Sequence, residues 1–302
     1  MASYRTLQFS IVVPTYLRTG QLSDLLFSLT RLKYRSTDFE VIVVDDGGYI
    51  PLEPIIFRFC DQLKLTLLRQ EKNAGPAYAR NKGAACAEGQ FLAFIDDDCL
   101  VDPGWLQALS EGFTQSPHCI CGGKTFNILD QNPYSTASQL LIDHLYEHFS
   151  PVDKFGGFFP TNNFAVPRKR FLEIDGFDPT LRFGEDREFC QRWTSRGYPF
   201  LSNPDAVVYH SHELNLMSFL RLHFLYGGGS FQFRRRCFDR NQSPGKLSPP
   251  SFYLRLIMSG ITKEKSLRGL LFSLLLAASQ MANTAGLMRE AVKYTHEWVR
   301  RK

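Results

Sequence analysis

Two patterns of hydrophobic positions alternate along the first third of the chain. Short apolar runs are typical of buried strands, and each run is followed by a segment whose apolar residues recur at helical spacing. The predicted strands cover residues 9–14, 39–46, 63–68 and 90–95. The predicted helices cover residues 21–33, 54–62, 75–87 and 103–115. This alternation favours an α/β fold with a doubly wound, mostly parallel sheet flanked by helices.

The pattern becomes less regular after residue 118. Shorter strands follow, a helix is predicted over residues 134–149, and a Gly/Pro-rich loop occupies residues 155–160. We therefore predict a first domain of residues 1–214 that divides into halves 1–118 and 119–214.

The last part of the chain, residues 215–302, is predicted to be a helical extension. A helix over residues 216–224 is expected to break at Gly227-Gly228-Gly229, and a Pro-rich link covers residues 243–250 before a long last helix. The apolar run at residues 270–288 contains five polar side chains, so we expect a packed or interfacial helix in preference to a spanning one. The five are Ser273, Ser279, Gln280, Asn283 and Thr284.

Composition and charge narrow the classes of function. The chain has 302 residues, a formal net charge of +5 and a pI near 8.8, and its basic residues are scattered, with a concentration late in the chain. Charge alone therefore does not indicate nucleic acid, which we do not expect as a partner. A basic C-terminal half suits an anionic membrane surface and a phosphate-bearing substrate equally well.

The cysteines and the N-terminus bear on location. The seven cysteines are an odd, scattered set, and no pair has the spacing of zinc ligands or of a redox motif. Such a set is typical of a reducing compartment. The first residues lead into a predicted strand without the apolar stretch of a signal peptide, so a cytoplasmic location is expected.

Acidic residues close two of the predicted strands. Asp45-Asp46 end the second strand, and Asp96-Asp97-Asp98 end the fourth. Ligands bind beyond the carboxyl ends of the strands in a doubly wound sheet. Carboxylates held there suit a hard divalent cation that also binds phosphate oxygens, although solvated acidic loops are the plain alternative. Because the chain has no Gly-x-Gly-x-x-Gly after its first strand and no P-loop, we favour metal-assisted diphosphate binding.

Five motifs occur in a fixed order within the first two thirds of the chain. They are Ile11-Val12-Val13-Pro14-Thr15-Tyr16, Val43-Val44-Asp45-Asp46-Gly47, the segment from Asn73 to Gly83, Phe94-Ile95-Asp96-Asp97-Asp98 and Gly184-Glu185-Asp186. Together they resemble the family 2 glycosyltransferases of GT-A fold, and such an ordered set is far more specific than one motif. The resemblance implies a GT-A catalytic domain whose first half binds a nucleotide-sugar and whose second half receives the acceptor.

The resemblance also implies where the donor binds. Pro14, Thr15 and Tyr16 would line the nucleoside pocket, and Asp46, with Asp45 beside it, would accept hydrogen bonds from the base. A carboxylate that accepts a base N–H is a stringent polar contact in an otherwise apolar slot. The alternative for Asp45-Asp46-Gly47-Gly48 is a solvated turn, because these residue types are strong turn formers.

The donor's diphosphate and its metal are implied at the second acidic strand end. Arg80 would contact the base or the diphosphate, although its spacing also fits the exposed face of a helix. By resemblance, Asp97 faces ribose and metal, Asp98 ligates Mg²⁺ or Mn²⁺ directly, and Asp96 lies on the donor side, where it shapes the strand end. His210 is a candidate for a further metal ligand, with a structural histidine as the alternative.

The resemblance assigns the reaction as well. Asp186 would be the general base that deprotonates an acceptor hydroxyl, with Glu185 as the alternate, in an inverting single displacement. Dipole-favoured acids at a helix start are the plain alternative for this pair. Asn162 or Asn163 would hydrogen-bond sugar hydroxyls on the acceptor side, although capping asparagines are equally common in turns.

One departure from the family narrows the reaction. The run Gln191-Arg192-Trp193 lacks the two-residue gap found in processive synthases, so a polymerising, channel-forming enzyme is disfavoured. The acceptor is expected to be a saccharide or a lipid-linked molecule in glycan, polysaccharide or glycolipid assembly. The basic and aromatic C-terminal helices fit a peripheral contact with the inner face of the membrane and a plain helical cap equally well.

Two rival functions remain in view. A sugar nucleotidyltransferase would need a Gly-rich, basic loop after the first strand, and Leu17-Arg18-Thr19-Gly20 supplies one arginine and one glycine. A non-catalytic GT-A-fold scaffold, which would bind a partner through its helical tail, does not need the acids that this chain has at every expected position.

Overall fold

A computed structural model describes residues 7–149, 157–243 and 248–301 of the chain. The chain forms two compact units. Unit 1 comprises Met1–Phe126 and Pro151–Ser211, and unit 2 comprises Asn127–Ser150 and His212–Lys302. The predicted boundary at residue 214 stays a prediction, as does the division at residue 118. Part of the predicted loop at residues 155–160 lies outside the described residues.

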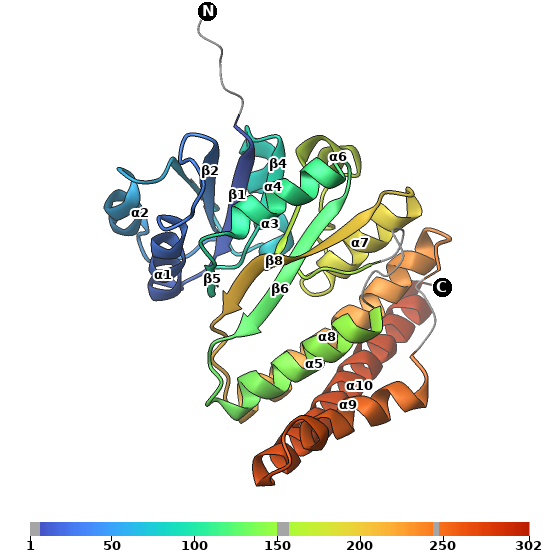
Figure 1. The fold of residues 1–302 in the computed structure, drawn as a ribbon. Coiled ribbons are helices and arrows are strands. Elements are labelled where there is room, and N and C mark those ends of the chain that lie inside the picture. Colours follow the sequence, from blue (N-terminus) through green and yellow to red (C-terminus); the bar gives the residue numbers. More distant parts are fainter. Residues whose placement is uncertain (1–6, 150–156, 244–247, 302) are drawn as a thin grey trace, which may run out of the picture. The chain divides into compact units, whose positions relative to one another are not determined.

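The first half of the sheet in unit 1 is parallel, as the sequence predicts (Figure 1). Its strands are β1 (Phe9–Thr15), β2 (Phe39–Asp45), β3 (Leu65–Arg69) and β4 (Phe91–Phe94). They lie in the order β3-β2-β1-β4, and all three pairings are parallel. Every residue of β1, β2 and β4 is buried, which is typical of a parallel sheet covered on both faces.

The other four strands complete the predicted α/β sheet with antiparallel pairings. They are β5 (Cys99–Val101), β6 (Ile120–Asn127), β7 (Phe164–Pro167) and β8 (Phe200–His210). Strand β7 pairs antiparallel with both β4 and β6, and β5 pairs antiparallel with β8. The β5–β8 register places Cys99 opposite His210. It therefore brings the residue that follows the acidic triplet beside a histidine more than 100 positions later.

Helices cover one face of this sheet through alternate strand residues. These helices are α1 (Thr19–Leu29), α2 (Glu53–Phe59) and α4 (Trp105–Gln115). Leu25 of α1, Leu109 of α4 and Ile11 of β1 belong to the same buried apolar cluster. Side chains alternate across a strand, so the neighbours of Ile11 face the other layer.

The opposite face is covered by three more helices. They are α3 (Pro76–Cys86), α6 (Arg168–Glu173) and α7 (Glu185–Ser195). The ring of Phe94 on β4 lies 5.2 Å from that of Phe171 on α6, which lies 5.3 Å from that of Phe189 on α7. A Cβ on Gly83 of α3 would lie 2.5 Å from the side chain of Val12 on β1. Close contact of α3 with the sheet therefore requires a glycine there.

Unit 2 is helical, as predicted, and its helices are α5 (Pro133–Phe149), α8 (Leu216–Asp239), α9 (Pro250–Lys263) and α10 (Leu267–Arg301). The predicted break at Gly227-Gly228-Gly229 is wrong, because α8 continues through it. A Cβ on Gly227 would lie 1.8 Å from the carbonyl oxygen of Asn283 on α10, and one on Gly286 would lie 1.8 Å from that of Phe224. These glycines allow α8 and α10 to pack backbone to backbone.

Helix α10 contains the long apolar run. Over Leu267–His296 it is long and apolar enough to cross a membrane by length and composition, with 33% of that window buried. It is one such helix among the residues that the structure describes. Two of its serine hydroxyls have hydrogen-bond partners within unit 2. Ser273 Oγ accepts a hydrogen bond from the Ile261 amide of α9, and Ser279 Oγ donates one to the Leu276 carbonyl.

Candidate functional site

The acidic triplet lies at the carboxyl edge of the parallel strands, in a turn between β4 and β5. The amide of Cys99 donates to the carbonyl of Asp96 at 3.2 Å, which closes the turn, and the Ser211 amide after β8 donates to the carbonyl of Asp98 at 2.8 Å. The side chains of Asp97 and Asp98 are buried, whereas that of Asp96 is 31% exposed. The turn therefore separates three adjacent acids into two environments.

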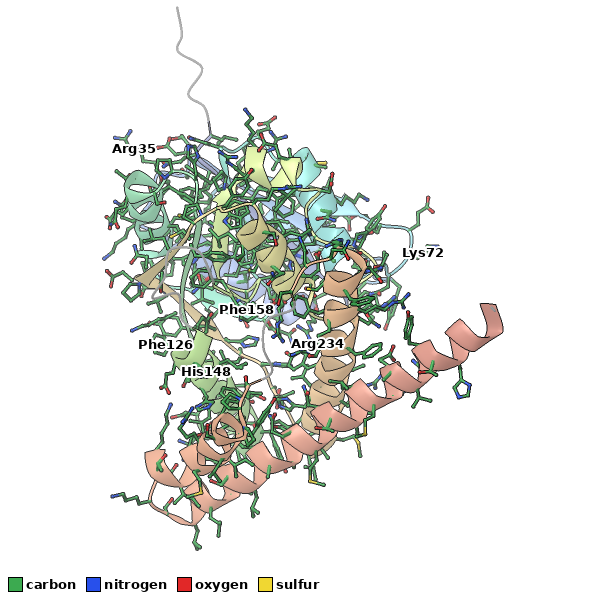
Figure 2. The ribbon with its side chains drawn as sticks, turned by 90° about the vertical axis from the view of Figure 1, so that its right-hand side faces the viewer. Arg35, Lys72, Phe126, His148, Phe158 and Arg234 are labelled. Carbon is green, nitrogen blue, oxygen red and sulfur yellow. The ribbon has the colours of Figure 1, made fainter. Side chains whose placement is uncertain are left out.

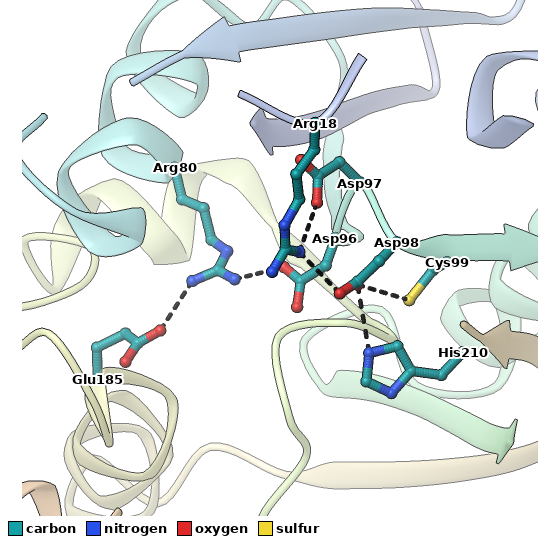
Figure 3. A network of polar contacts seen from close by, with 8 residues as sticks. All are labelled: Arg18, Arg80, Asp96, Asp97, Asp98, Cys99, Glu185 and His210. Carbon is teal, nitrogen blue, oxygen red and sulfur yellow. Dashed lines mark hydrogen bonds and ion pairs between the residues drawn. The ribbon is translucent and has the colours of Figure 1, made fainter. Parts of the chain in front are cut away.

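Arg18 binds the two buried acids of the triplet (Figure 3). Its Nη1 atom lies 3.1 Å from Asp97 Oδ1 and 2.8 Å from Asp98 Oδ2. Thr15 Oγ1 donates a hydrogen bond of 2.6 Å to Asp97 Oδ2. Arg18 was not among the residues expected at the site. The available signal was its position, three residues after a strand whose neighbours in the sheet end in acids.

The pKa of Asp97 reflects these contacts. Burial raises it from its ordinary value to about 6, and the charge of Arg18 and the hydrogen bond from Thr15 oppose this rise. Two further carboxylates in the same turn, Asp98 and Asp96, raise it again. A cation held at this cluster favours the ionised acids.

Asp98 also contacts the end of β8. His210 Nε2 lies 3.2 Å from Asp98 Oδ1, and ligand atoms of Asp98, Cys99 and His210 all lie within 4.8 Å of one another. Burial lowers the pKa of His210, but the hydrogen bond and charge of Asp98 outweigh burial, so the pKa is raised. Carboxylate oxygens with one imidazole suit Mn²⁺ or Mg²⁺, whereas a thiol suits softer metals. Asp98 and His210 therefore fit such a divalent cation, whereas Cys99, which was not expected beside them, does not.

Arg80 joins the triplet to the start of α7 (Figure 3). Its Nη2 atom lies 2.5 Å from Asp96 Oδ1 and its Nη1 atom 2.8 Å from Glu185 Oε1. Arg80 is only 3% exposed, so the alternative of a surface arginine does not hold. The carboxylate of Glu185 is buried as well, and burial raises its pKa although the charge of Arg80 opposes the rise. One guanidinium thus connects segments that are about 100 residues apart in the chain.

Asp186 follows Glu185 in the first turn of α7, after Gly184 with a φ of +81°. Its Oδ1 atom accepts the Arg187 amide at 2.7 Å. Burial, followed by the charge of Glu185, raises the pKa of Asp186 to about 7. An acid with a pKa near neutrality is suited to take up and release a proton at physiological pH.

The acids at the end of β2 are held by the chain. Asp46 Oδ1 accepts hydrogen bonds from Gln70 Nε2 at 2.9 Å and the Ala74 amide at 2.8 Å, and Oδ2 accepts one from the Gly75 amide at 2.9 Å. Asp45 accepts from the Gly48 amide and pairs with Arg69. The segment therefore forms a turn, but its two acids are buried and not solvated, and their contact with the base stays a prediction. Asp46 also fixes the loop that leads into α3.

The remaining predicted residues lie at the end of β1 and in the segment just before β7. Pro14 and Thr15 are buried at the end of β1, and Tyr16, which follows them, is 44% exposed. Asn162 is 7% exposed, and its Oδ1 atom has no hydrogen-bond partner among the described residues.

Asn163 has a different role from the predicted one. It is fully buried, its Oδ1 accepts from Trp105 Nε1 at 2.9 Å, and its Nδ2 donates to the carbonyls of Lys124 and Ala206 at 2.9 Å each. These bonds join α4, β6 and β8, so its amide belongs to the core and leaves no surface for an acceptor.

Comparison with known proteins gives a family match. The model of the family described as "Glycosyl transferase family 2" matches residues 10–182. The chain is 28% identical over 227 residues to the pre-mycofactocin glycosyltransferase of Mycobacterium tuberculosis, covering 73% of this chain and 46% of that relative. It is 27% identical over 250 residues to the validoxylamine A glucosyltransferase of Streptomyces hygroscopicus, covering 70% of this chain and 58% of the relative. The chain thus spans about half the length of these curated relatives.

Two solved structures are similar in fold. The mannosyltransferase PcManGT from Pyrobaculum calidifontis, in complex with GDP-Man and Mn²⁺, has a TM-score of 0.64 at 17% identity. The match covers 96% of this chain and 87% of PcManGT. A fragment of S. aureus TarS in complex with UDP-GlcNAc has a TM-score of 0.55 at 19% identity, covering 96% and 92% of the two chains. At these identities the likeness concerns the fold alone.

Proposed function

The chain belongs to glycosyl transferase family 2, and from this premise we propose that it transfers a sugar from a nucleoside-diphosphate donor to a hydroxyl acceptor with inversion at the anomeric carbon. The observation that carries the proposal is the Arg80 network. The buried guanidinium pairs with Asp96 of the acidic triplet on one side and, on the other, with Glu185, whose neighbour Asp186 has a pKa of about 7. Leaving-group and acceptor chemistry need these two groups close together.

The donor half of the proposal rests on the carboxyl edge of β1 and β4. Asp98, with Asp97 and His210, would hold Mg²⁺ or Mn²⁺, which supplies positive charge to the diphosphate oxygens as the glycosidic bond breaks. Thr15 at the end of β1 contacts Asp97 of this cluster, and Thr15, the preceding Pro14 and the exposed Tyr16 that follows would line the nucleoside pocket. PcManGT with GDP-Man and Mn²⁺ supports a nucleotide-sugar with a divalent cation.

Donor contacts are also proposed for three other acids and for Arg80. The carboxylate of Asp46 retains acceptor capacity beside its three chain donors and can take a base N–H, with Asp45 behind it. Arg80 and Asp96 line the same edge and orient the diphosphate side of the donor. Binding measurements on variants of these residues distinguish a donor contact from an effect on folding.

The acceptor half of the proposal rests on α7 and the loop before β7. Asp186 takes the proton of the acceptor hydroxyl as that oxygen forms its bond to the anomeric carbon, and the nucleoside diphosphate leaves with the electron pair of the broken bond. Glu185 stays paired with Arg80 and positions the turn. The buried Oδ1 of Asn162, which has no partner within residues 7–149, 157–243 and 248–301, accepts a hydrogen bond from a sugar hydroxyl.

A binding and transfer experiment tests this function. We expect Mn²⁺-dependent binding of UDP or GDP by calorimetry, and transfer from a UDP- or GDP-sugar that Asp98→Asn abolishes together with Mn²⁺ binding. Asp186→Asn is expected to keep donor binding and to lose transfer, because it changes only the proton acceptor. Retained Mn²⁺ binding in Asp98→Asn would remove the metal assignment. If no nucleotide binds at all, the chain is a non-catalytic scaffold.

For location, we propose that α10 lies on an anionic membrane surface. Seven apolar side chains of α10 are exposed, and four of them recur at intervals of seven residues. The seven are Leu267, Leu270, Leu271, Leu274, Met281, Met288 and Val292. No charged residue lies between Gly269 and Met288, whereas Lys265 and Arg268 precede this stretch and Arg289 and Lys293 follow it.

The charges of unit 2 favour lipid over a second copy of the chain as the occupant of this stripe. Two α10 helices paired in either direction would place cationic ends together, whereas anionic headgroups neutralise them. The consecutive arginines of α8, Arg234 to Arg236, add positive charge to the same unit (Arg234 is labelled in Figure 2). A surface helix of this kind is the expected place to meet a lipid-linked acceptor.

Vesicle flotation tests this location. We expect the protein to float with vesicles of phosphatidylcholine and phosphatidylglycerol, and to float much less with phosphatidylcholine alone. Leu274→Ser with Met281→Ser should abolish flotation, because it removes apolar area from the stripe. The matched control is Leu172→Ser, which removes an exposed leucine from α6. A concentration-dependent dimer without flotation would show that a second copy occupies the stripe.

A further inference from the structure

Arg18 has an unusual local setting for an arginine. It occupies the N-cap position of α1, yet its side chain makes no capping hydrogen bond. A Ser, Thr, Asp or Asn there would stabilise the helix by accepting a hydrogen bond from a free backbone amide. A cation at this end also opposes the positive pole of the helix dipole. The preceding Leu17 adopts a φ of +58°, a left-handed conformation that is unfavourable for a leucine.

The contacts of Arg18 offset these local disadvantages. Its Nη1 atom reaches both Asp97 and Asp98, at 3.1 and 2.8 Å, and these carboxylates are 5% and 9% exposed. Arg18 itself is 45% exposed, so it can leave the acids without being extracted from a packed core. It is therefore a partly exposed counter-ion for two nearly buried charges.

The oxygens that Arg18 binds are the ones that a divalent cation would need. Asp98 Oδ2 contacts Arg18 and Asp98 Oδ1 contacts His210, so both oxygens of this carboxylate are in use. A guanidinium and a divalent cation carry like charge and cannot share the same carboxylates at bonding distance without strong repulsion. One must leave when the other arrives.

We propose that Arg18 competes with the divalent cation for Asp97 and Asp98, and that the donor's diphosphate resolves the competition by giving Arg18 a new anionic partner. The inference rests on the proposed function, which places the cation at these acids. The affinity for the metal is then high only when the nucleotide is bound. Metal and donor bind in an interdependent way, and free metal alone is bound weakly.

Substitution of Arg18 by glutamine separates two effects of opposite sign. In Arg18→Gln with no nucleotide, Mn²⁺ measured by the electron paramagnetic resonance signal of the free ion should bind roughly tenfold more tightly, because about 1.4 kcal/mol of competition is removed. With saturating Mn²⁺, the same variant should bind UDP or GDP more weakly than the unsubstituted protein. A residue that only supports the fold would not move the two affinities in opposite directions.

Two further variants complete the experiment. Arg18→Lys should fall between the unsubstituted protein and Arg18→Gln in both affinities, since it keeps the charge and loses the guanidinium geometry. Arg35→Gln removes one exposed positive charge from the same unit and should change neither affinity. It controls for net charge, and thermal unfolding checks that each variant is folded.

The outcomes distinguish a failure of the Arg18 competition from a failure of the proposed transferase function. Equal Mn²⁺ affinities of the unsubstituted protein and Arg18→Gln would overturn the competition and leave the metal site in place. If the unsubstituted protein binds no Mn²⁺ even with UDP or GDP present, the proposed function itself fails. Tighter Mn²⁺ binding with unchanged nucleotide binding would overturn the role of the diphosphate.

Discussion

Removal of the Arg80 guanidinium should destabilise unit 1 in a way that depends on pH. Arg80→Met keeps most of the side-chain volume and deletes the cation that pairs with Asp96 and Glu185. Arg80 and Glu185 are 4% and 8% exposed, so the substitution leaves an uncompensated buried acid. Breaking a buried pair from one side costs about 3–5 kcal/mol.

The pH dependence follows from the pKa of Glu185. Burial already raises this pKa in the presence of Arg80, and loss of the guanidinium raises it further. The unfolded chain then releases the Glu185 proton at a lower pH than the folded variant does. The folded variant binds more protons than the unfolded chain across that interval, so its stability falls as pH rises. The full loss is expected at high pH, and a smaller loss is expected as the pH falls and the folded acid takes up its proton.

Urea unfolding followed by tryptophan fluorescence measures this effect, because Trp105 and Trp193 are fully buried in unit 1. Arg80→Met combined with Glu185→Gln should recover most of the loss at high pH, since no buried charge then lacks a partner. The control is Lys169→Met. Lys169 is 89% exposed and pairs with Glu173, which is itself 41% exposed, so its removal should cost only about 0–1 kcal/mol. An equal loss at high and at low pH would refute the assignment of the effect to Glu185.

Three other measurements test the site and the packing. The kcat/KM for transfer should rise with pH through about 7 as Asp186 ionises, and a rise that persists in Asp186→Asn would exclude this residue as the base. Gly123→Ala should cost about 3 kcal/mol or more, because the new Cβ would lie 1.8 Å from the carbonyl oxygen of Ala206; Gly20→Ala, with no atom within 4 Å, is the control and should leave stability unchanged or raise it. Asn163→Ala should lower the free energy of unfolding by about 2–5 kcal/mol, and a loss of acceptor affinity without any change in stability would restore the acceptor-side prediction for this residue.

Much of the parallel half of the fold could be predicted from the sequence. The apolar runs of β1, β2 and β4 are continuous because both faces of these strands are buried, and such runs are easy to recognise. The antiparallel half was less readable. Strand β7 has four residues and β5 has three, which is too short for a periodic pattern.

Glycines were misread where their role depends on a partner helix. The sequence around Gly227 indicates a break, and only the proximity of the Asn283 carbonyl shows that the position requires a residue without a Cβ. Periodicity within one segment contains no information about which other segment will pack against it.

The clustering of the acids at the strand ends could be expected from the sequence, whereas the contacts of Arg18 and Cys99 with them could not. Asp97, Asp98 and Asp186 were recognisable because they stand at strand and helix ends within ordered motifs. Arg18 and Cys99 were missed, since their contacts depend on how a loop turns and on the register of β5 with β8. Long polar side chains reach partners that no spacing rule specifies.

The position of Arg80 between Asp96 and Glu185 makes communication across the site reciprocal. A ligand that draws Asp96 away strengthens the hold of the guanidinium on Glu185, and through the charge of Glu185 it alters the proton affinity of Asp186. Thermodynamic linkage requires the reverse as well. If the proposed donor, bound beside Asp96, changes the affinity for the acceptor by some factor, the acceptor changes the affinity for the donor by the same factor.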